Sequence, residues 1–158
     1  MFRELTRKNK QIPAEECAEI LTKETRGVLS VNGDDGYPYG MPMNHYYDAE
    51  SGNIYFHCGR VGHRLDALRN DPKVSFCVFE QGTRKEGAWA YDVRSVIVFG
   101  HVEIVDDAAE VARVARLLSY KFTSDDAYIE KEIASYARAT LLLKLVPAHI
   151  TGKRVTES

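Results

Sequence analysis

Short runs of apolar or alternating apolar and polar residues recur along the chain and predict a mainly β protein. Period-two alternation is typical of a strand with one buried face. Most connections between the runs are too short for a crossover helix, so neighbouring strands should pair antiparallel. Six strands are predicted in this way, at residues 27–31, 37–47, 53–58, 73–80, 94–105 and 140–146.

The longest predicted strand contains Gly100, which indicates a bulge or a bend where a sheet curls. Residues 149–153 can extend the last strand beyond Pro147. Six antiparallel strands with such a bend favour a closed or partly closed barrel, because closure removes exposed strand edges. Apolar positions at helical spacing predict flanking helices. These helices fall at about 13–23, 63–70, 111–122 and 129–137, with Asp106 and Asp107 placed to cap the third.

The composition fits one globular domain over residues 1–158, with 44% hydrophobic and 28% charged residues. A net charge of -2 supplies no basic field, so we expect neither nucleic acid nor a membrane surface as a partner. No apolar run reaches the length of about 18 residues that a membrane span needs. Three cysteines without a CxxC pair, and a polar start to the chain, favour reduced thiols and a cytoplasmic location.

Residues 54–74 carry the groups best suited to bind an anion. A strand runs into a loop with Gly59 and Gly62, and then into a helix start with His63 and Arg64. Glycines allow a ligand close to the backbone, and the first helical turn offers unbonded N–H groups. The guanidinium is a planar fork that matches phosphate oxygens. The pattern favours a phosphate site, although most arginines at helix starts are simply solvated.

Residues 37–47 are suited to hold a flat heteroaromatic ring. Pro38 and Pro42 cannot donate ladder hydrogen bonds, so the strand is an edge or is bulged, and backbone groups are left for a ligand. Met41 and Met43 add an adaptable apolar surface. A core strand lined by methionine and tyrosine explains the same residues without any ligand.

Histidine and cysteine near the third predicted strand raise two further possibilities. His57, Cys58 and His63 are residue types that bind zinc, but their spacing matches no standard zinc pattern, and we expect no metal. Cys58 as a nucleophile would need a base nearby. His57 is adjacent in sequence, yet neighbours on a strand point to opposite faces, which disfavours this pair.

The order of several segments resembles the FMN-binding split-barrel proteins, the superfamily that includes pyridoxamine 5'-phosphate oxidase. The segments are TRGVLSV, YPYGMPMNHYYD, GNIYFHC, GHRLDALRNDPKVSF, RSVIVFGHVEIV and ITGK, and they cover roughly residues 26–154. The similarity is greatest to the flavin-nucleotide-binding proteins related to nitroimidazole resistance. It implies a six-stranded antiparallel split barrel with flanking helices, and a homodimer with FMN at two sites shared between subunits.

The resemblance also implies which residues form the site. In the oxidase branch a Ser-x-Lys motif, with a Leu four residues beyond the Lys, holds the FMN phosphate. Gly62, Arg64 and Leu68 stand at those positions here. Glycine lacks the hydroxyl, so backbone N–H groups, His63 or Ser95 would have to replace it. The implied cofactor-binding residues are Met41, Pro42, Met43, Asn44, His57, Cys58, Gly62, His63, Arg64, Ser95 and Val96.

Three functions follow from this resemblance. The first is an FMN-dependent oxidoreductase that passes electrons from NAD(P)H to a small aromatic or nitro-type acceptor, with His57 as the catalytic polar group that faces the substrate. The second is a flavin carrier, store or redox sensor without turnover. The third, pyridoxamine 5'-phosphate oxidase activity, is disfavoured because the motif serine is missing and only Lys153 and Arg154 are basic near the C-terminus.

Overall fold

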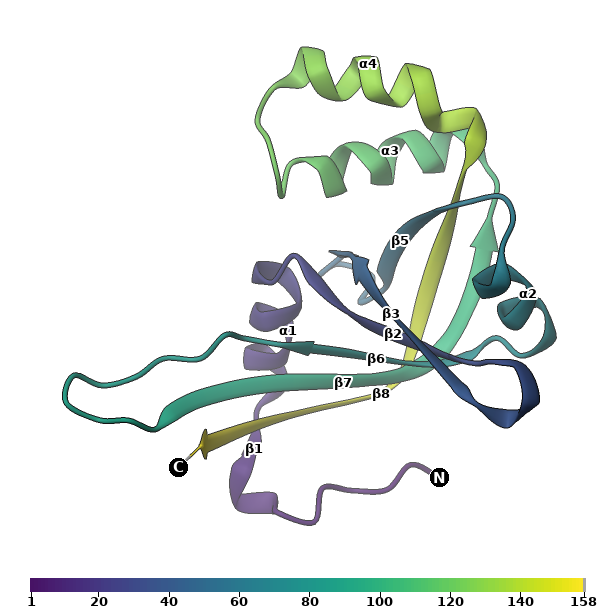
Figure 1. Cartoon of the computed structure of the whole chain (residues 1–158). Coiled ribbons are helices and arrows are strands. Elements are labelled where there is room, and N and C mark those ends of the chain that lie inside the picture. The colour runs from purple at the N-terminus through teal and green to yellow at the C-terminus, as the bar shows by residue number, and fades with distance from the viewer. Residues whose placement is uncertain (158) are drawn as a thin grey trace.

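A single curled antiparallel sheet organises the computed structural model, which describes residues 1–157 (Figure 1). Its long strands are β2 (Arg26–Asn32), β3 (Pro38–Asn44), β5 (Ile54–Gly59), β6 (Lys73–Phe79), β7 (Tyr91–Val105) and β8 (Thr140–Glu157). Two strands of two residues each, β1 (Gln11–Ile12) and β4 (Tyr46–Tyr47), extend the sheet. The order is β3-β2-β6-β7-β8-β5-β4, with β1 paired to β8. The half-barrel with flanking helices confirms the predicted fold class.

Four helices flank the sheet. They are α1 (Ala14–Lys23), α2 (His63–Asn70), α3 (Ala108–Ser119) and α4 (Asp126–Tyr136), and α3 and α4 form a hairpin at one end of the barrel (Figure 1). Asp107 caps α3 and Asp125 caps α4, each by accepting a hydrogen bond from a backbone N–H three residues later. The cap at Asp125 starts α4 earlier than its apolar spacing predicted. Within residues 1–157, no helix is long and apolar enough to cross a membrane.

The barrel interior is filled by the inward faces of the strands and closed on one side by α1. Phe56 and Phe76 pack edge to face, with ring centroids 4.9 Å apart, and both are fully buried. Ile20 and Leu21 of α1 are buried in the same cluster. Burial of this kind supplies about 25 cal/mol for each Å² of apolar surface removed from water, so α1 is part of the core.

The two longest strands meet at a bulge. Phe99 pairs with His149 and Gly100 pairs with Pro147, so one residue of β8 between them has no partner on β7. This confirms the bulge predicted at Gly100. A Cβ atom at Gly100 would collide with the carbonyl oxygen of Val146. β8 continues through Pro147 as one strand to Glu157, which confirms the predicted extension over residues 149–153.

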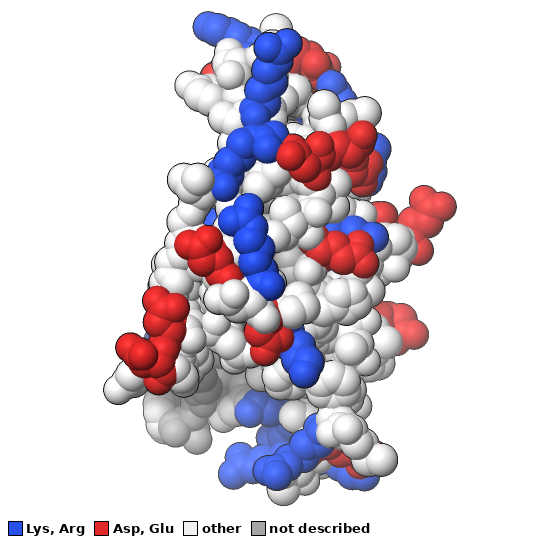
Figure 2. All heavy atoms as spheres, turned by 90° about the vertical axis from the view of Figure 1, so that its right-hand side faces the viewer, with Lys and Arg blue, Asp and Glu red and all other residues white. Residues whose placement is uncertain are grey.

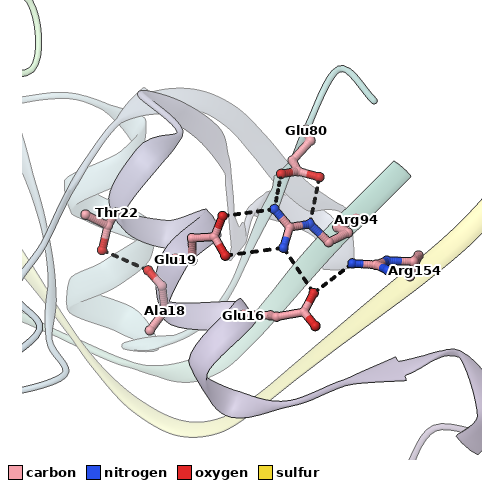
Figure 3. A network of polar contacts seen from close by, with 7 residues as sticks. All are labelled: Glu16, Ala18, Glu19, Thr22, Glu80, Arg94 and Arg154. Carbon is pink, nitrogen blue, oxygen red and sulfur yellow. Dashed lines mark hydrogen bonds and ion pairs between the residues drawn. The ribbon is translucent and has the colours of Figure 1, made fainter. Parts of the chain in front are cut away.

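A network of charges fastens α1 to the sheet (Figure 3). The Arg94 side chain on β7 is only 15% exposed and donates two hydrogen bonds to Glu80, at 2.6 and 3.0 Å. It also contacts Glu16 at 3.0 Å and Glu19 at 3.3 Å, both on α1. Arg154 on β8 adds a second cation to Glu16, at 3.0 Å. Hydrogen bonds from Arg94 lower the pKa of Glu80, so the carboxylate is charged in this network.

His45 connects α1, the core and the segment that follows α3. Its ring is fully buried, and its Nε2–H donates to the carbonyl of Leu21 at 2.7 Å. The Lys121 ammonium donates to the backbone carbonyls of His45, at 2.9 Å, and of Glu24, at 2.6 Å. Burial, together with the charge of Lys121, lowers the pKa of His45 to about 4. His45 is therefore a neutral structural group at pH 7.

Candidate functional site

Three adjoining hollows form one groove between β3, β5, α2 and the α3–α4 hairpin. The arginine hollow is lined by Arg26, Pro42, Met43, Asn44, His57 and Arg64. The glycine hollow is lined by Tyr39, Cys58, Gly59, Val61, Gly62, His63, Arg64 and Leu65. The helical hollow lies under the hairpin and shares Asn44 and His57 with the first, and Cys58 and Gly59 with the second. The residues common to their walls show that the three hollows adjoin one another.

The glycine hollow is bordered by open backbone at the start of α2. A Cβ atom at Gly59 or Gly62 would meet no atom within 4 Å. The N–H groups of Leu65 and Asp66 bond to the carbonyl of Gly62, which leaves those of His63 and Arg64 without a partner among the described residues. Unbonded amides at a helix N-terminus are suited to an anion.

Gly62 stands where the related motif has serine, and its conformation accounts for the difference. Its φ angle is 130°, a value that residues with a side chain rarely adopt. A serine at this position would be strained. The loop therefore presents backbone groups where a hydroxyl would otherwise serve.

Two arginines line the arginine hollow. Arg64 Nε donates to the sulfur of Met41 at 3.0 Å, and Arg26 Nε donates to Asn44 Oδ1 at 2.8 Å. Within residues 1–157 neither guanidinium forms an ion pair with a carboxylate. Sequence reasoning named Arg64 and missed Arg26. Arg26 lies just before the strand predicted at 27–31, and only the observed strand pairing brings it opposite Asn44.

The charge on this side of the molecule is mixed outside the groove. Figure 2, which views the side that carries α2 in Figure 1, shows a broken line of Lys and Arg with Asp and Glu beside it. The mixture matches the net charge of -2. The two arginines of the hollow are therefore a local pair of cations and do not belong to a broad basic field.

The ring of His63 is directed to the turn between β2 and β3. It stacks on Tyr39, with centroids 4.4 Å apart and planes 14° from parallel, and its Nε2 lies 3.4 Å from Asp34. These contacts occupy the imidazole. His63 thus contributes its backbone N–H to the glycine hollow, while its ring supports the neighbouring turn.

His57 and Cys58 end β5 beside both hollows. His57 is exposed, while Cys58 is buried, so the two side chains lie on opposite faces as expected for strand neighbours. Desolvation by the surrounding groove and the charge of Arg64 lower the pKa of His57, which makes the ring neutral at pH 7. Burial raises the pKa of the Cys58 thiol, although Arg64 opposes the shift. A protonated thiol is a poor nucleophile, so the geometry does not favour Cys58 in that role.

The other predicted cofactor residues divide into two groups. Pro42, Met43 and Asn44 line the arginine hollow, and Met41 lies in the core, where its sulfur contacts Arg64.

Ser95 and Val96 lie on β7 and line none of the three hollows of their own chain. Val96 is fully buried in the core, and Ser95 pairs with Phe79 across the sheet. Any contribution of these two residues to the site would therefore involve the outer face of the sheet or the backbone. Within residues 1–157, no three His, Cys, Asp or Glu side chains are grouped so as to hold a metal ion.

The helical hollow was not predicted from the sequence. Its volume is about 430 Å³, and its wall is mainly apolar. The apolar spacing predicts α3 and α4 only as separate helices, whereas the hollow exists because they fold back over β5 and the start of β8. Besides the residues it shares, it is lined by Val111, Ala115, Leu118, Ser119, Phe122, Glu132, Ile133, Tyr136, Ala137 and Thr140.

Comparisons with known proteins agree with this architecture. A family model described as pyridoxamine 5'-phosphate oxidase matches residues 13–154. A conserved hypothetical protein from Mycobacterium tuberculosis has a TM-score of 0.79 at 20% identity, over 95% of this chain and 90% of that chain. A candidate 5-nitroimidazole antibiotic resistance protein from Bacteroides thetaiotaomicron has a TM-score of 0.76 at 19% identity, over 93% and 87%.

A third solved structure, the FAD binding protein from Mycobacterium smegmatis, has a TM-score of 0.66 at 19% identity, over 94% of this chain and 99% of that chain. At these identities the solved structures support the fold. No curated protein matches the sequence.

Proposed function

This chain belongs to the pyridoxamine 5'-phosphate oxidase family, and we propose that it binds FMN in the groove and uses it as an oxidoreductase. The family match confirms the resemblance seen in the sequence. The observation that carries the proposal is the start of α2, where Arg64 and two unbonded N–H groups border open backbone at Gly59 and Gly62. This combination suits the phosphate of a flavin mononucleotide.

We assign the residues of the groove to the parts of FMN in order. The amides of His63 and Arg64 and the Arg64 guanidinium would hold the phosphate, with Arg26 as a second cation beside it. Pro42, Met43 and Asn44 would lie along the ring system. When bound, FMN supplies hydride and electron transfer, and the protein supplies binding, orientation and hydrogen bonds.

His57 is the polar group that we place next to the substrate. It is exposed in the groove and lines both the arginine hollow and the helical hollow. As a neutral ring it can donate one hydrogen bond and accept another, and so orient a polar acceptor. The proposed reaction passes electrons from NAD(P)H to a small aromatic or nitro-type acceptor. The fold shared with the candidate nitroimidazole resistance protein supports this acceptor class.

A second copy of the chain would complete the site. Val28, Phe79, Ile97 and Phe99 lie on β2, β6 and β7, and each is more than a third exposed. Apolar side chains gathered on one sheet face are typical of an interface. Ser95 is the cross-strand neighbour of Phe79, so a homodimer through this face would bring Ser95 to the boundary between subunits. Sedimentation as a monomer at working concentration would contradict this arrangement.

Replacing Arg64 with alanine is expected to weaken FMN binding by roughly 10- to 100-fold, because hydrogen bonds to a charged group contribute about 1.5–3 kcal/mol. The measurement is titration of flavin-free protein with FMN, followed by absorption and fluorescence, with FAD as a parallel ligand. Arg69→Ala is the matched control, since Arg69 lies on the same helix, is exposed and pairs with Asp66. Equal FMN affinity for Arg64→Ala and Arg69→Ala would refute the phosphate site.

Replacing His57 with alanine should leave FMN bound and slow turnover by about 100-fold, the scale of a lost proton-transfer or orienting group. Turnover is followed as NAD(P)H oxidation with a nitroaromatic acceptor. The control is His101→Ala, because His101 lies on β7 and lines none of the hollows. A wild-type protein that binds FMN but never cycles would favour the carrier or sensor, and unchanged turnover in His57→Ala would exclude the role of His57.

A further inference from the structure

The helical hollow is a partly open apolar space walled by both helices of the hairpin and by the end of β5. Val111 and Leu118 of α3 are buried and form part of its wall, and Phe122 follows them beyond the helix end. Opposite them, Ile133 and Tyr136 contribute the wall on α4. An apolar space of about 430 Å³ with a few polar groups has the character of a small-molecule site.

Glu132 is the one carboxylate in this wall, and it is half-buried. In the described part of the chain its side chain forms no hydrogen bond or ion pair. The other carboxylates of the hairpin and its caps all have partners, which are backbone amides, arginines or a tyrosine hydroxyl. They are Asp107, Glu110, Asp125, Asp126 and Glu130. Among these carboxylates, the unpartnered one is the one that faces the hollow.

Several cations of the hairpin region are already paired, while Lys131 and Arg138 are exposed and form no ion pair among the described residues. Arg60 pairs with Asp106 at the base of the hairpin, Arg116 pairs with Glu130, and Lys121 donates to backbone carbonyls. A negative charge beside an apolar wall is costly unless a positive group or a hydrogen-bond donor reaches it. A cationic ligand in the hollow would supply that group from the apolar side.

The hollow also has the position that a substrate site requires. It shares Asn44 and His57 with the arginine hollow, where the proposed flavin ring lies. A molecule in the hollow would therefore lie against His57, beside the proposed flavin ring. The helical hollow and the proposed flavin site adjoin within the same groove.

We propose that the helical hollow binds the organic substrate, and that this substrate is a small aromatic molecule with a basic nitrogen that pairs with Glu132. This inference rests on the proposed function, because a molecule in the hollow is a substrate only if flavin binds in the adjoining arginine hollow. Apolar side chains of α3 and α4 enclose the ring, and Glu132 selects the cation. An aromatic carboxylate of the same size would be repelled.

The test uses three probes of one shape: 2-naphthylmethylamine, 2-naphthalenemethanol and 2-naphthoate. Their affinities are measured by calorimetry on the full chain, with and without FMN. The amine should bind at least tenfold more tightly than the alcohol, and naphthoate should bind most weakly. Glu132→Gln should remove the preference for the amine while the alcohol changes by less than about twofold. Glu50→Gln, which removes the same charge in an exposed turn outside the hollow, should keep the preference.

Ala115→Phe provides a second variant, since a phenyl ring at this lining position fills the hollow and should abolish binding of all three probes. Equal binding of the three probes, or an amine preference that survives in Glu132→Gln, would overturn the proposal. Failure of every probe on a protein that still shows bound FMN would overturn it and leave the proposed function standing. Selective amine binding by a protein that takes up no flavin would instead support the hollow and contradict the proposed function.

Discussion

Gly100→Ala is expected to destabilise the protein by about 3 kcal/mol or more, at the upper end of overpacking costs. The added Cβ would meet the carbonyl oxygen of Val146 and approach Leu145 to 2.8 Å. The first of these atoms is backbone within β8, so it cannot move without disturbing the pairing of the two longest strands. For a chain of this size the midpoint of thermal unfolding should fall by on the order of 10 °C.

The measurement is thermal and denaturant unfolding of Gly100→Ala beside Gly59→Ala. Gly59 is also a strand glycine, but a Cβ there meets nothing within 4 Å. Its replacement should be neutral or stabilising by about 0.5 kcal/mol, because alanine loses less backbone entropy on folding. If the two variants unfolded at the same temperature, the close approach of β7 and β8 at the bulge would be wrong.

Acid should destabilise the native state through His45 before the carboxylates titrate. The pKa of this group falls from 6.5 to about 4 in the folded protein. Between these two pH values His45 is protonated in the unfolded chain and neutral in the native state. The free energy of unfolding therefore falls as the pH is lowered from 6.5 to 4. The difference corresponds to about 3 kcal/mol at most, since one pKa unit is about 1.4 kcal/mol.

Urea unfolding of the wild type and of His45→Gln at several pH values between 6.5 and 4.5 tests this. Glutamine keeps an N–H donor for the Leu21 carbonyl but does not titrate. The wild type should lose stability across the window, and His45→Gln should start lower but lose less, keeping only the part of the fall that the lowered pKa of His57 contributes. His101→Gln, a change at an exposed histidine, should follow the wild type. Parallel curves for the wild type and His45→Gln would show that His45 protonates without cost.

The sheet could be predicted from the sequence because its signals are local. Alternation located the six long strands, and Gly100 marked the bulge. Prediction failed where distant partners decide the pairing. Residues 37–47 were predicted as one strand, but β3 pairs with β2 and β4 pairs with β5, so the chain changes partner between Asn44 and Tyr46.

The candidate site also has a part that the sequence predicts locally and a part that only the fold brings together. The loop from Gly59 to Arg64 is contiguous in the chain, and its glycines and arginine indicated an anion site directly. Arg26 and Glu132 gave no local signal, because an isolated charged residue in a strand or helix is usually solvated. Their place at a candidate site is visible only in the structure, where β3, β5 and the hairpin form the hollows that these two residues line. The role of Glu132 thus depends on packing that no short segment encodes.

The length of β8 sets the order in which the barrel can be completed. Its first half pairs with both β5 and β7, and its second half pairs with β7 and β1, so it joins strands from the beginning and the middle of the chain. Such contacts between distant segments close large loops and slow folding. During synthesis, the edges of β5 and β7 that pair with β8 keep unpaired backbone groups until residues 140–157 leave the ribosome. The growing chain is therefore most exposed to aggregation and most dependent on chaperones in the interval just before β8 emerges.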